Sequence, residues 1–314
     1  MTRALVLNAG SSWGAYQIGA LEYLVGRRRQ HFDVCAGTGI GAMNAAFVAC
    51  GKFDELTRFW DTIRMRSLVT PHLRAPWRAP LTNTPQRRFV AAHIDERALI
   101  DRGTSLAVSV VDLRSGREVM LRYPGAGLPL VDGIMAATAT PGLVRPIRHG
   151  RQLLAEATLV ESVPMAAVAD PDGAGGQQVG EIVAVLTGLP IDGGERRRYS
   201  TWRAVAERSV AMNLAHDARR AVENHAADAA FATGGATVAT AVNALADTLA
   251  DRELAGQLRS RLTAAVAPLE GRAVPQLTAI VPTRELGYPL WRFRRPDLAA
   301  ARALGCADAE AAVG

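Results

Sequence analysis

The stretch from residue 34 to residue 46, VCAGTGIGAMNAA, has the composition of a turn that presents one side chain for chemistry. An apolar run leads into it, small residues follow, and an alanine-rich helical segment comes next. This layout is typical of a nucleophile elbow, where a sharp strand-to-helix turn with the pattern G-x-S-x-G exposes a serine hydroxyl. Gly39 stands where that serine would be. The sequence therefore predicts an elbow that cannot form an acyl-serine.

A second turn of small residues, from Asn8 to Gly14, lies closer to the N-terminus. We expect it to follow a buried strand at residues 4–7 and to precede a helix over residues 15–24. Backbone N–H groups at the start of such a helix favour negative charge in the turn. The turn is not a nucleotide-binding phosphate loop, because no Lys-Ser or Lys-Thr pair follows Gly14.

Both turns need strands and helices to position them, and the rest of the chain supplies an alternating pattern of the two. Such alternation predicts an α/β three-layer fold with a mainly parallel central sheet flanked by helices. Four prolines between residues 67 and 86 indicate a loop or an irregular cap, and two alanine-rich helices are expected over 201–231 and 236–266. Since composition shows no strong break, we expect a single domain over 1–314, with a core at 1–190 and a mostly helical part at 191–314.

The net charge of +6 is carried almost wholly by arginine, with Lys52 as the one lysine. Most charges are scattered, so we expect solvated surface and no nucleic-acid partner. Cys35, Cys50 and Cys306 lack metal or disulfide spacing, and the six histidines show no pairing at metal spacing. We therefore expect no metal and no cofactor. The basic runs are Arg27-Arg28-Arg29, Arg196-Arg197-Arg198, and Arg292 with Arg294-Arg295.

The first residues lack the charged region, long apolar region and cleavage site of a signal peptide. No apolar run reaches 18 residues, so no membrane-spanning helix is expected. From these two features we expect a cytoplasmic protein.

Several blocks of the chain, in order, resemble the patatin-like phospholipase family. The blocks are Asn8–Leu21, Gly37–Ala45, Ala136–Pro146, Glu156–Pro164, Leu277–Pro282 and Leu304–Asp308. In the family these blocks hold the oxyanion loop, the serine elbow, the segment before the catalytic aspartate, the aspartate itself, and the last strand and helix. The resemblance implies the patatin fold and a pocket beside the elbow.

Members of that family hydrolyse acyl esters with a Ser–Asp dyad and backbone amides that hold the oxyanion. By resemblance, Glu156 stands at the aspartate position and is the candidate catalytic residue, with Ala157 and Thr158 in place of two glycines. Ala9 and Ser11 replace two glycines of the oxyanion loop, and Trp13 replaces a basic residue at the pocket rim. The resemblance predicts a substrate and oxyanion pocket formed by Gly10, Ser11, Ser12, Trp13, Gly14, Thr38, Gly39 and Ile40.

Three functions remain open at this level. The leading hypothesis is a patatin-like protein that has lost acyl hydrolysis and binds a small acyl or lipid-like ligand in the retained pocket. The alternative is a repurposed enzyme in which Glu156 acts as general acid or base for non-covalent hydrolysis, cyclisation or elimination. The third is a structural or partner-binding scaffold with a closed pocket. Peripheral contact of the arginine runs with anionic lipid is a further hypothesis, and the oligomeric state stays open.

Overall fold

A computed structural model of the chain describes residues 2–73, 77, 79–169, 178–188, 200–248, 252–253, 256–257, 260 and 274–314. For several residues between 235 and 248 it describes only the backbone. The arginine run at 196–198 and the last part of the helix expected over 236–266 lie outside the described residues.

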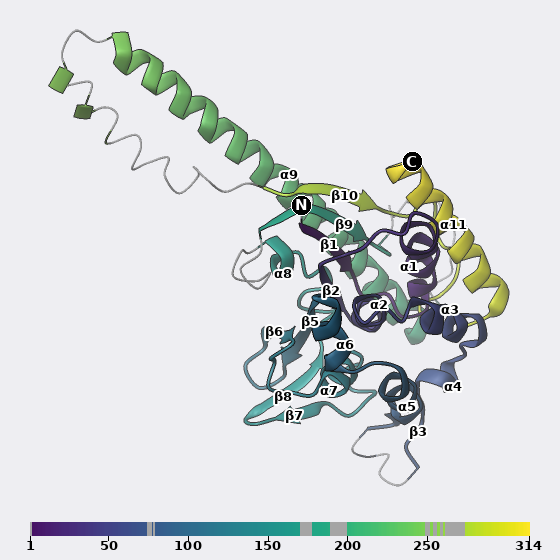
Figure 1. Cartoon of the computed structure of the whole chain (residues 1–314). Helices are drawn as coiled ribbons and strands as arrows, with labels where there is room; N and C mark the ends of the chain where they lie inside the picture. Colours follow the sequence, from purple (N-terminus) through teal and green to yellow (C-terminus); the bar gives the residue numbers. More distant parts are fainter. Residues whose placement is uncertain are drawn as a thin grey trace.

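An eight-stranded sheet in the order β10-β9-β1-β2-β5-β8-β7, with β6 beside β5, forms the centre of the molecule (Figure 1). Neighbours among β10, β9, β1, β2 and β5 are parallel, whereas β6 and β8 run antiparallel to β5, and β7 runs antiparallel to β8. The strands are β1 (Thr2–Leu7), β2 (Val34–Thr38), β5 (Ser105–Asp112), β6 (Arg117–Tyr123), β7 (Ile147–His149), β8 (Gln152–Glu156), β9 (Val179–Val185) and β10 (Gln276–Ile280). The expected α/β class with a mainly parallel sheet is confirmed.

Helices cover both faces of this sheet. They are η1 (Ser11–Trp13), α1 (Gly14–Leu21), η2 (Glu22–Arg27), α2 (Ile40–Ala49), α3 (Phe53–Thr62), α4 (Met65–Leu68), α5 (Thr84–His93), α6 (Glu96–Arg102), α7 (Leu130–Ala137), α8 (Ala166–Ala169), α9 (Trp202–Thr248) and α11 (Arg295–Val313). Among the described helices, none is both long and apolar enough to cross a membrane.

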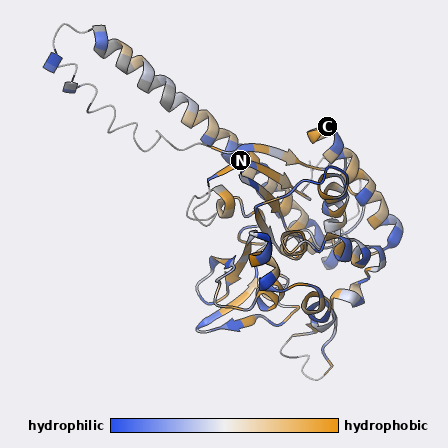
Figure 2. Cartoon of the chain, in the orientation of Figure 1, coloured by the Kyte–Doolittle hydropathy of each residue, from blue (hydrophilic) through white to orange (hydrophobic). Residues whose placement is uncertain are grey.

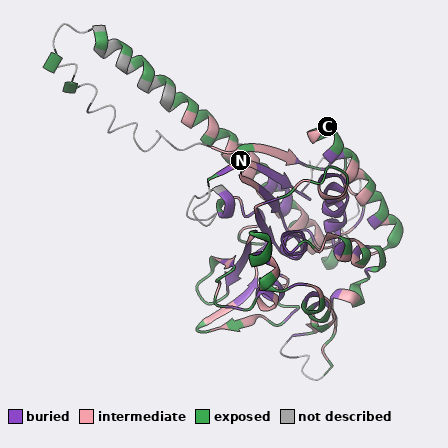
Figure 3. Cartoon of the chain, viewed as in Figure 1, coloured by how far each residue is buried: buried purple, intermediate pink, exposed green. Residues whose placement is uncertain are grey.

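Alternation along β1 shows how the layers are divided. Leu5 and Leu7 point into the larger core, which α1, α2, α3, α7 and α11 help to build. Ala4 and Val6 point to the other face, where α8 and the part of α9 around Ala218 cover them. Successive side chains of a strand face opposite sides, so a strand between two helical layers must be apolar at every position. The central strands β1, β2 and β5 are buried over most of their residues, as Figure 3 shows, and Figure 2 shows the distribution of apolar residues along the chain.

Helices α1 and α11 pack against each other without side chains at their closest points. A Cβ atom on Gly19 would overlap the backbone carbonyl of Arg302, and one on Gly305 would overlap the carbonyl of Tyr16. The hydroxyl of Tyr16 also donates to Asp308 over 3.0 Å. This contact ties the last helix to the helix that follows the oxyanion loop.

Two expectations about elements were wrong. The segment 67–86, expected as a loop, holds the end of α4, a short ladder between β3 (Thr70–Pro71) and β4 (Leu81–Thr82), and the start of α5. Pro85 sits in the first turn of α5, where its missing N–H would have no partner in any case. No break separates the two helices expected over 201–231 and 236–266, because α9 continues through Gly234 to Thr248.

Candidate functional site

Gly39 forms the sharp turn between β2 and α2. Its φ of 60° and ψ of −131° lie in a region that other residues rarely adopt. The turn is also crowded, because a Cβ atom on Gly37 would overlap the backbone of α2 and one on Gly41 would overlap the backbone of the oxyanion loop. The backbone therefore has the elbow shape that the sequence predicts, with no side chain at its tip.

The Glu156 side chain occupies the space beside this tip. Glu156 is the last residue of β8, opposite Val110 of β5, and the strand directs its carboxylate toward the elbow. A Cβ atom on Gly39 would lie 2.8 Å from Oε1 of Glu156 and 3.1 Å from the Cβ atom of Ala9. A side chain at position 39 would therefore require the Glu156 carboxylate, the end of a flexible side chain, to shift.

Two threonine hydroxyls hold the Glu156 carboxylate. Thr140 donates to Oε2 over 2.7 Å and Thr158 donates to Oε1 over 2.6 Å. The Glu156 amide donates to the Ala139 carbonyl over 3.1 Å, which fixes the backbone at the end of the strand. Burial raises the pKa of the Glu156 carboxyl, and the two hydroxyls oppose this rise because they stabilise the charged form. The carboxyl is thus shifted toward keeping its proton.

The oxyanion loop is held in place mainly by the segment before α11. The Ser12 amide and hydroxyl both donate to the Leu290 carbonyl, over 2.9 Å and 2.6 Å. The Trp13 indole N–H donates to the Tyr288 carbonyl over 3.0 Å. Ser11 has a φ of 48°, which is left-handed backbone and uncommon for serine. Ser11 therefore has a backbone conformation that glycine usually adopts, in a loop that these hydrogen bonds hold in place.

A buried chain of amide side chains links this loop to the elbow helix. The Gln17 amide donates to the Asn8 carbonyl over 2.8 Å, and Asn44 of α2 donates to the Gln17 oxygen over 2.9 Å. The Trp60 indole donates to Asn44 over 3.0 Å, and the Thr187 amide donates to the Asn8 side chain over 2.8 Å. Four separate elements thereby fix the two turns relative to each other.

Three backbone amides border the same space. Gly10 and Ser11 come from the oxyanion loop, and Ile40 is the first residue of α2, directly after the elbow. Within the described part of the chain, no hydrogen bond is recorded from these three amides. Amides in this arrangement can bind an oxygen that carries negative charge, whether it belongs to a ligand or develops during a reaction.

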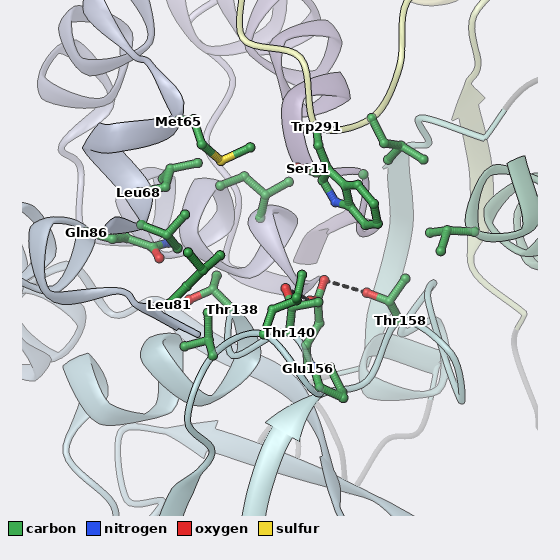
Figure 4. A pocket seen from close by; sticks show the side chains of 18 of the residues that line it. Ser11, Met65, Leu68, Leu81, Gln86, Thr138, Thr140, Glu156, Thr158 and Trp291 are labelled. Carbon is green, nitrogen blue, oxygen red and sulfur yellow. Dashed lines mark hydrogen bonds between the residues drawn. The ribbon is translucent and has the colours of Figure 1, made fainter. Parts of the chain in front are cut away.

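A cavity of about 460 Å³ opens beside the carboxylate (Figure 4). Its walls come from the two turns, from α4, α5 and the first turns of α9, and from the segment after Tyr288. In Figure 4 the Glu156 carboxylate points into the cavity from one side, while Ser11 and Trp291 lie on the other. The lining residues are Gly10, Ser11, Ile40, Met65, Leu68, Val69, Leu81, Gln86, Thr138, Thr140, Pro141, Leu143, Val144, Glu156, Thr158, Leu159, Arg203, Val210, Leu214, Leu290, Trp291 and Phe293.

The residues expected to form the pocket divide into two groups. Gly10, Ser11, Ile40 and Glu156 line the cavity, and Gly39 lies directly beneath the Glu156 carboxylate. The remaining four do not line it. Ser12, Trp13, Gly14 and Thr38 are all buried in the fold behind it. Trp13, expected at the pocket rim, is only 5% exposed because its indole packs in the core.

Sequence reasoning missed the residues that hold and enclose the carboxylate. Thr158 was noted only as a replaced glycine, and Thr140 only as part of a matching block. A hydroxyl residue two positions after the glutamate was the available signal, but its side chain could equally have faced solvent. Trp291 and Phe293 reach the cavity from a segment with no regular periodicity, so no pattern pointed to them.

Comparison with known proteins shows which family this chain belongs to. The family model described as Patatin-like phospholipase matches residues 5–169, more than half of the chain, and the chain belongs to that family. Uncharacterized NTE family proteins from Mycobacterium bovis and from two strains of Mycobacterium tuberculosis are each 28% identical to it over 173 residues. The match covers 53% of this chain and 45% of each relative, so the chain spans about half the length of the curated relatives it matches.

Among solved structures, VipD from Legionella pneumophila is similar over 99% of this chain and 67% of its own length. The TM-score is 0.46 and the sequence identity is 12%.

Proposed function

We propose that this patatin-like protein binds a small acyl or lipid-like molecule in the cavity beside Gly39 and does not form an acyl-enzyme there. The observation that carries the proposal is the Glu156 carboxylate, whose Oε1 lies 2.8 Å from the place of a side chain at position 39. Gly39 supplies no hydroxyl, so the elbow lacks the nucleophile of a hydrolytic dyad, and the Glu156 carboxylate lies where a side chain would begin.

The walls of the cavity support the class of ligand. Met65, Leu68 and Val69 on one side, with Leu214 and Phe293 elsewhere, offer an apolar surface suited to a hydrocarbon chain. The amides of the oxyanion loop and of α2 can receive the oxygen of a head group. The open cavity is the observation that disfavours the scaffold hypothesis, which requires a pocket closed by side chains.

Displacement of a fluorescent fatty acid, with a matched pair of variants, tests the proposal. Leu81→Trp adds a large side chain to the cavity wall, whereas Ile100→Trp adds the same side chain on α6, where Ile100 is 61% exposed. We expect the first variant to weaken binding by about tenfold or more and the second to leave it unchanged. Native mass spectrometry of the purified protein supplies a second readout for a co-purified ligand. Equal binding by both variants, or no binding by the parent, would refute the proposal.

A second candidate function is acid–base chemistry at Glu156. Its support is the pKa of the Glu156 carboxyl, which burial raises and which therefore favours the protonated form, opposite amides that can stabilise an oxyanion or enolate. Hydrolysis of short-chain p-nitrophenyl esters across a range of pH tests it. Activity that is lost in Glu156→Gln, while fatty-acid binding persists, would favour this function over simple binding. Absence of activity in the parent, or unchanged activity in the variant, would count against it.

A further inference from the structure

One segment of the sequence carries a net charge as large as that of the whole chain. Between residues 62 and 94 the sequence holds six arginines and no aspartate or glutamate. Removing these six from the 36 basic residues of the chain leaves 30, which equals its 30 acidic residues. The whole net charge of +6 therefore equals the charge of this segment, which we call the 62–94 segment.

The 62–94 segment contains α4, the β3–β4 ladder and α5, which lie together at one end of the molecule (Figure 1). Arg64, Arg66 and Arg88 are exposed, and none of the three has an ion-pair partner among the described residues. Arg87 is paired with Asp132 over 2.5 Å, and Arg74 and Arg78 lie outside the described residues. At least three positive charges thus face solvent without compensation from an acidic side chain.

Two large apolar side chains project from the tip of the β3–β4 ladder. Leu73 is 87% exposed and Trp77 is 79% exposed. Among the large apolar side chains that the structure describes, only Trp202 is similarly exposed. The base of this tip is ordered, because the His72 amide donates to the Pro80 carbonyl over 2.9 Å. Exposed apolar side chains carry a cost in water, and tryptophan beside arginine is typical of residues at a membrane–water interface.

The same segment also forms one wall of the cavity. Met65, Leu68, Val69, Leu81 and Gln86 all line it. The Leu81 amide, at the base of the ladder, donates over 3.0 Å to the carbonyl of Leu143, which also lines the cavity. The exposed tip and the apolar cavity are thereby continuous parts of one structure.

We propose that the 62–94 segment is the surface by which this protein docks on an anionic lipid membrane. Leu73 and Trp77 enter the head-group region, while Arg64, Arg66 and Arg88 contact lipid phosphates. The contact places the cavity wall next to the source of an acyl or lipid-like ligand. This proposal builds on the proposed function, but vesicle binding can be measured separately from ligand binding.

Co-sedimentation with lipid vesicles tests the docking surface. We expect the full chain to bind vesicles that contain phosphatidylglycerol, to bind pure phosphatidylcholine much more weakly, and to lose binding as salt is raised. A basic residue near such a surface strengthens binding by roughly fivefold, so Arg64→Gln with Arg66→Gln and Arg88→Gln should weaken it by about a hundredfold. The matched control changes Arg27, Arg28 and Arg29 to Gln, which removes the same charge from an exposed site at the end of η2 and should weaken it far less.

The apolar tip has its own matched control. Trp77→Ser should weaken vesicle binding several-fold, whereas Trp202→Ser, at a side chain that is 83% exposed on α9, should not. Equal effects in either pair of variants would overturn the proposal. So would binding to single-stranded DNA in place of vesicles, since the segment would then serve a nucleic acid.

Fatty-acid displacement in the absence of vesicles separates this proposal from the proposed function. Loss of vesicle binding in the arginine variant, with unchanged fatty-acid binding, is the expected result. If the parent binds vesicles but no fatty acid, the docking surface stands and the proposed ligand falls. If the parent binds fatty acid but no anionic vesicles, only the docking surface is refuted.

Discussion

Glu156 and Gly39 compete for one space: the carboxylate of the first lies 2.8 Å from where a side chain on the second would begin. The elbow keeps its sharp backbone, with a φ of 60° at Gly39, although no side chain uses it. Two independent features therefore disfavour other residues at position 39, the backbone conformation and the contact with Glu156.

We expect Gly39→Ala to destabilise the fold by about 1–3 kcal/mol from backbone strain, with a further cost from the contact with Glu156. In the double variant Gly39→Ala with Glu156→Asp the carboxylate retreats by about 1.5 Å, the length of one bond, and the contact is relieved. The double variant should then lose less stability than the two single variants added together, by about 0.5–3 kcal/mol. Urea unfolding of the four proteins measures this coupling, and strict additivity would contradict it.

Restoring a dyad should need both changes. Gly39→Ser with Glu156→Asp should be labelled at position 39 by a fluorophosphonate probe, while the parent and Gly39→Ala with Glu156→Asp should not. We expect slow labelling, because loss of one oxyanion donor costs about 10²–10³ in rate and Ser11 alters the loop. A folded double serine variant that stays unlabelled would mean that the 156 carboxylate does not act on this elbow.

The raised pKa of Glu156 makes stability depend on pH in a defined direction. The unfolded chain releases the Glu156 proton at about pH 4.3, whereas the folded state keeps it to higher pH. The stability that the protonated carboxyl contributes is therefore present below that pH and is lost as the pH rises through the folded pKa. Glu156→Gln, which cannot ionise, should therefore gain stability relative to the parent as the pH rises. Urea unfolding from about pH 4 to about pH 8 measures this trend. Glu310→Gln, at an exposed glutamate of α11, is the control and should show no such trend.

The two threonines around the carboxylate should matter more than a third threonine of the cavity. Thr140→Val removes a donor to Glu156 and should cost about 1–3 kcal/mol, more at high pH, where the carboxylate is charged. Thr138→Val removes only a bond to the Ile134 carbonyl within its own helix and should cost less than about 1 kcal/mol. Equal losses would show that Thr140 does not support the carboxylate.

Glycines in two helices should respond oppositely to alanine. Gly305→Ala adds a methyl group where α11 meets the Tyr16 carbonyl and should cost roughly 1–3 kcal/mol or more, measured by urea unfolding. Gly234→Ala adds one in the interior of α9, where no atom lies within 4 Å, and should stabilise that helix by about 1 kcal/mol. Hydrogen exchange of the α9 amides detects the gain, and faster exchange in the variant would contradict it.

Sequence patterns sufficed for the sheet and for the two turns, because both depend on local features. Apolar runs mark strands buried on two faces, and small residues mark turns where backbone approaches backbone. The segment 67–86 was misread, since proline indicates a loop and a first helical turn equally well, and only the packing of α5 decides between them. Gly234 likewise reads as a helix end, but α9 continues through it.

The location of the site could be predicted from the sequence, but the side-chain contacts within it could not. The elbow and Glu156 came from a motif and from ordered blocks, which reflect backbone shape. The contact between the Glu156 carboxylate and Gly39 is set by a side-chain rotamer across the sheet, and the donors Thr140 and Thr158 reach it from separate turns. Long-range contacts of this kind have no period and no spacing along the chain. Trp13 was expected at the rim by resemblance to the family, but its indole packs in the core.

The position of β1 in the sheet determines when, during synthesis, both of its edges can pair with neighbouring strands. Its first neighbour is β2, at residues 34–38, but its second is β9, at residues 179–185, beyond the end of the family match at residue 169. At about 5–20 residues per second, synthesis needs on the order of ten seconds to pass from the one to the other. During that time an apolar strand has an unpaired edge, which invites pairing with other chains. In a fragment that stops at residue 169, β9 is missing and this edge of β1 would remain unpaired.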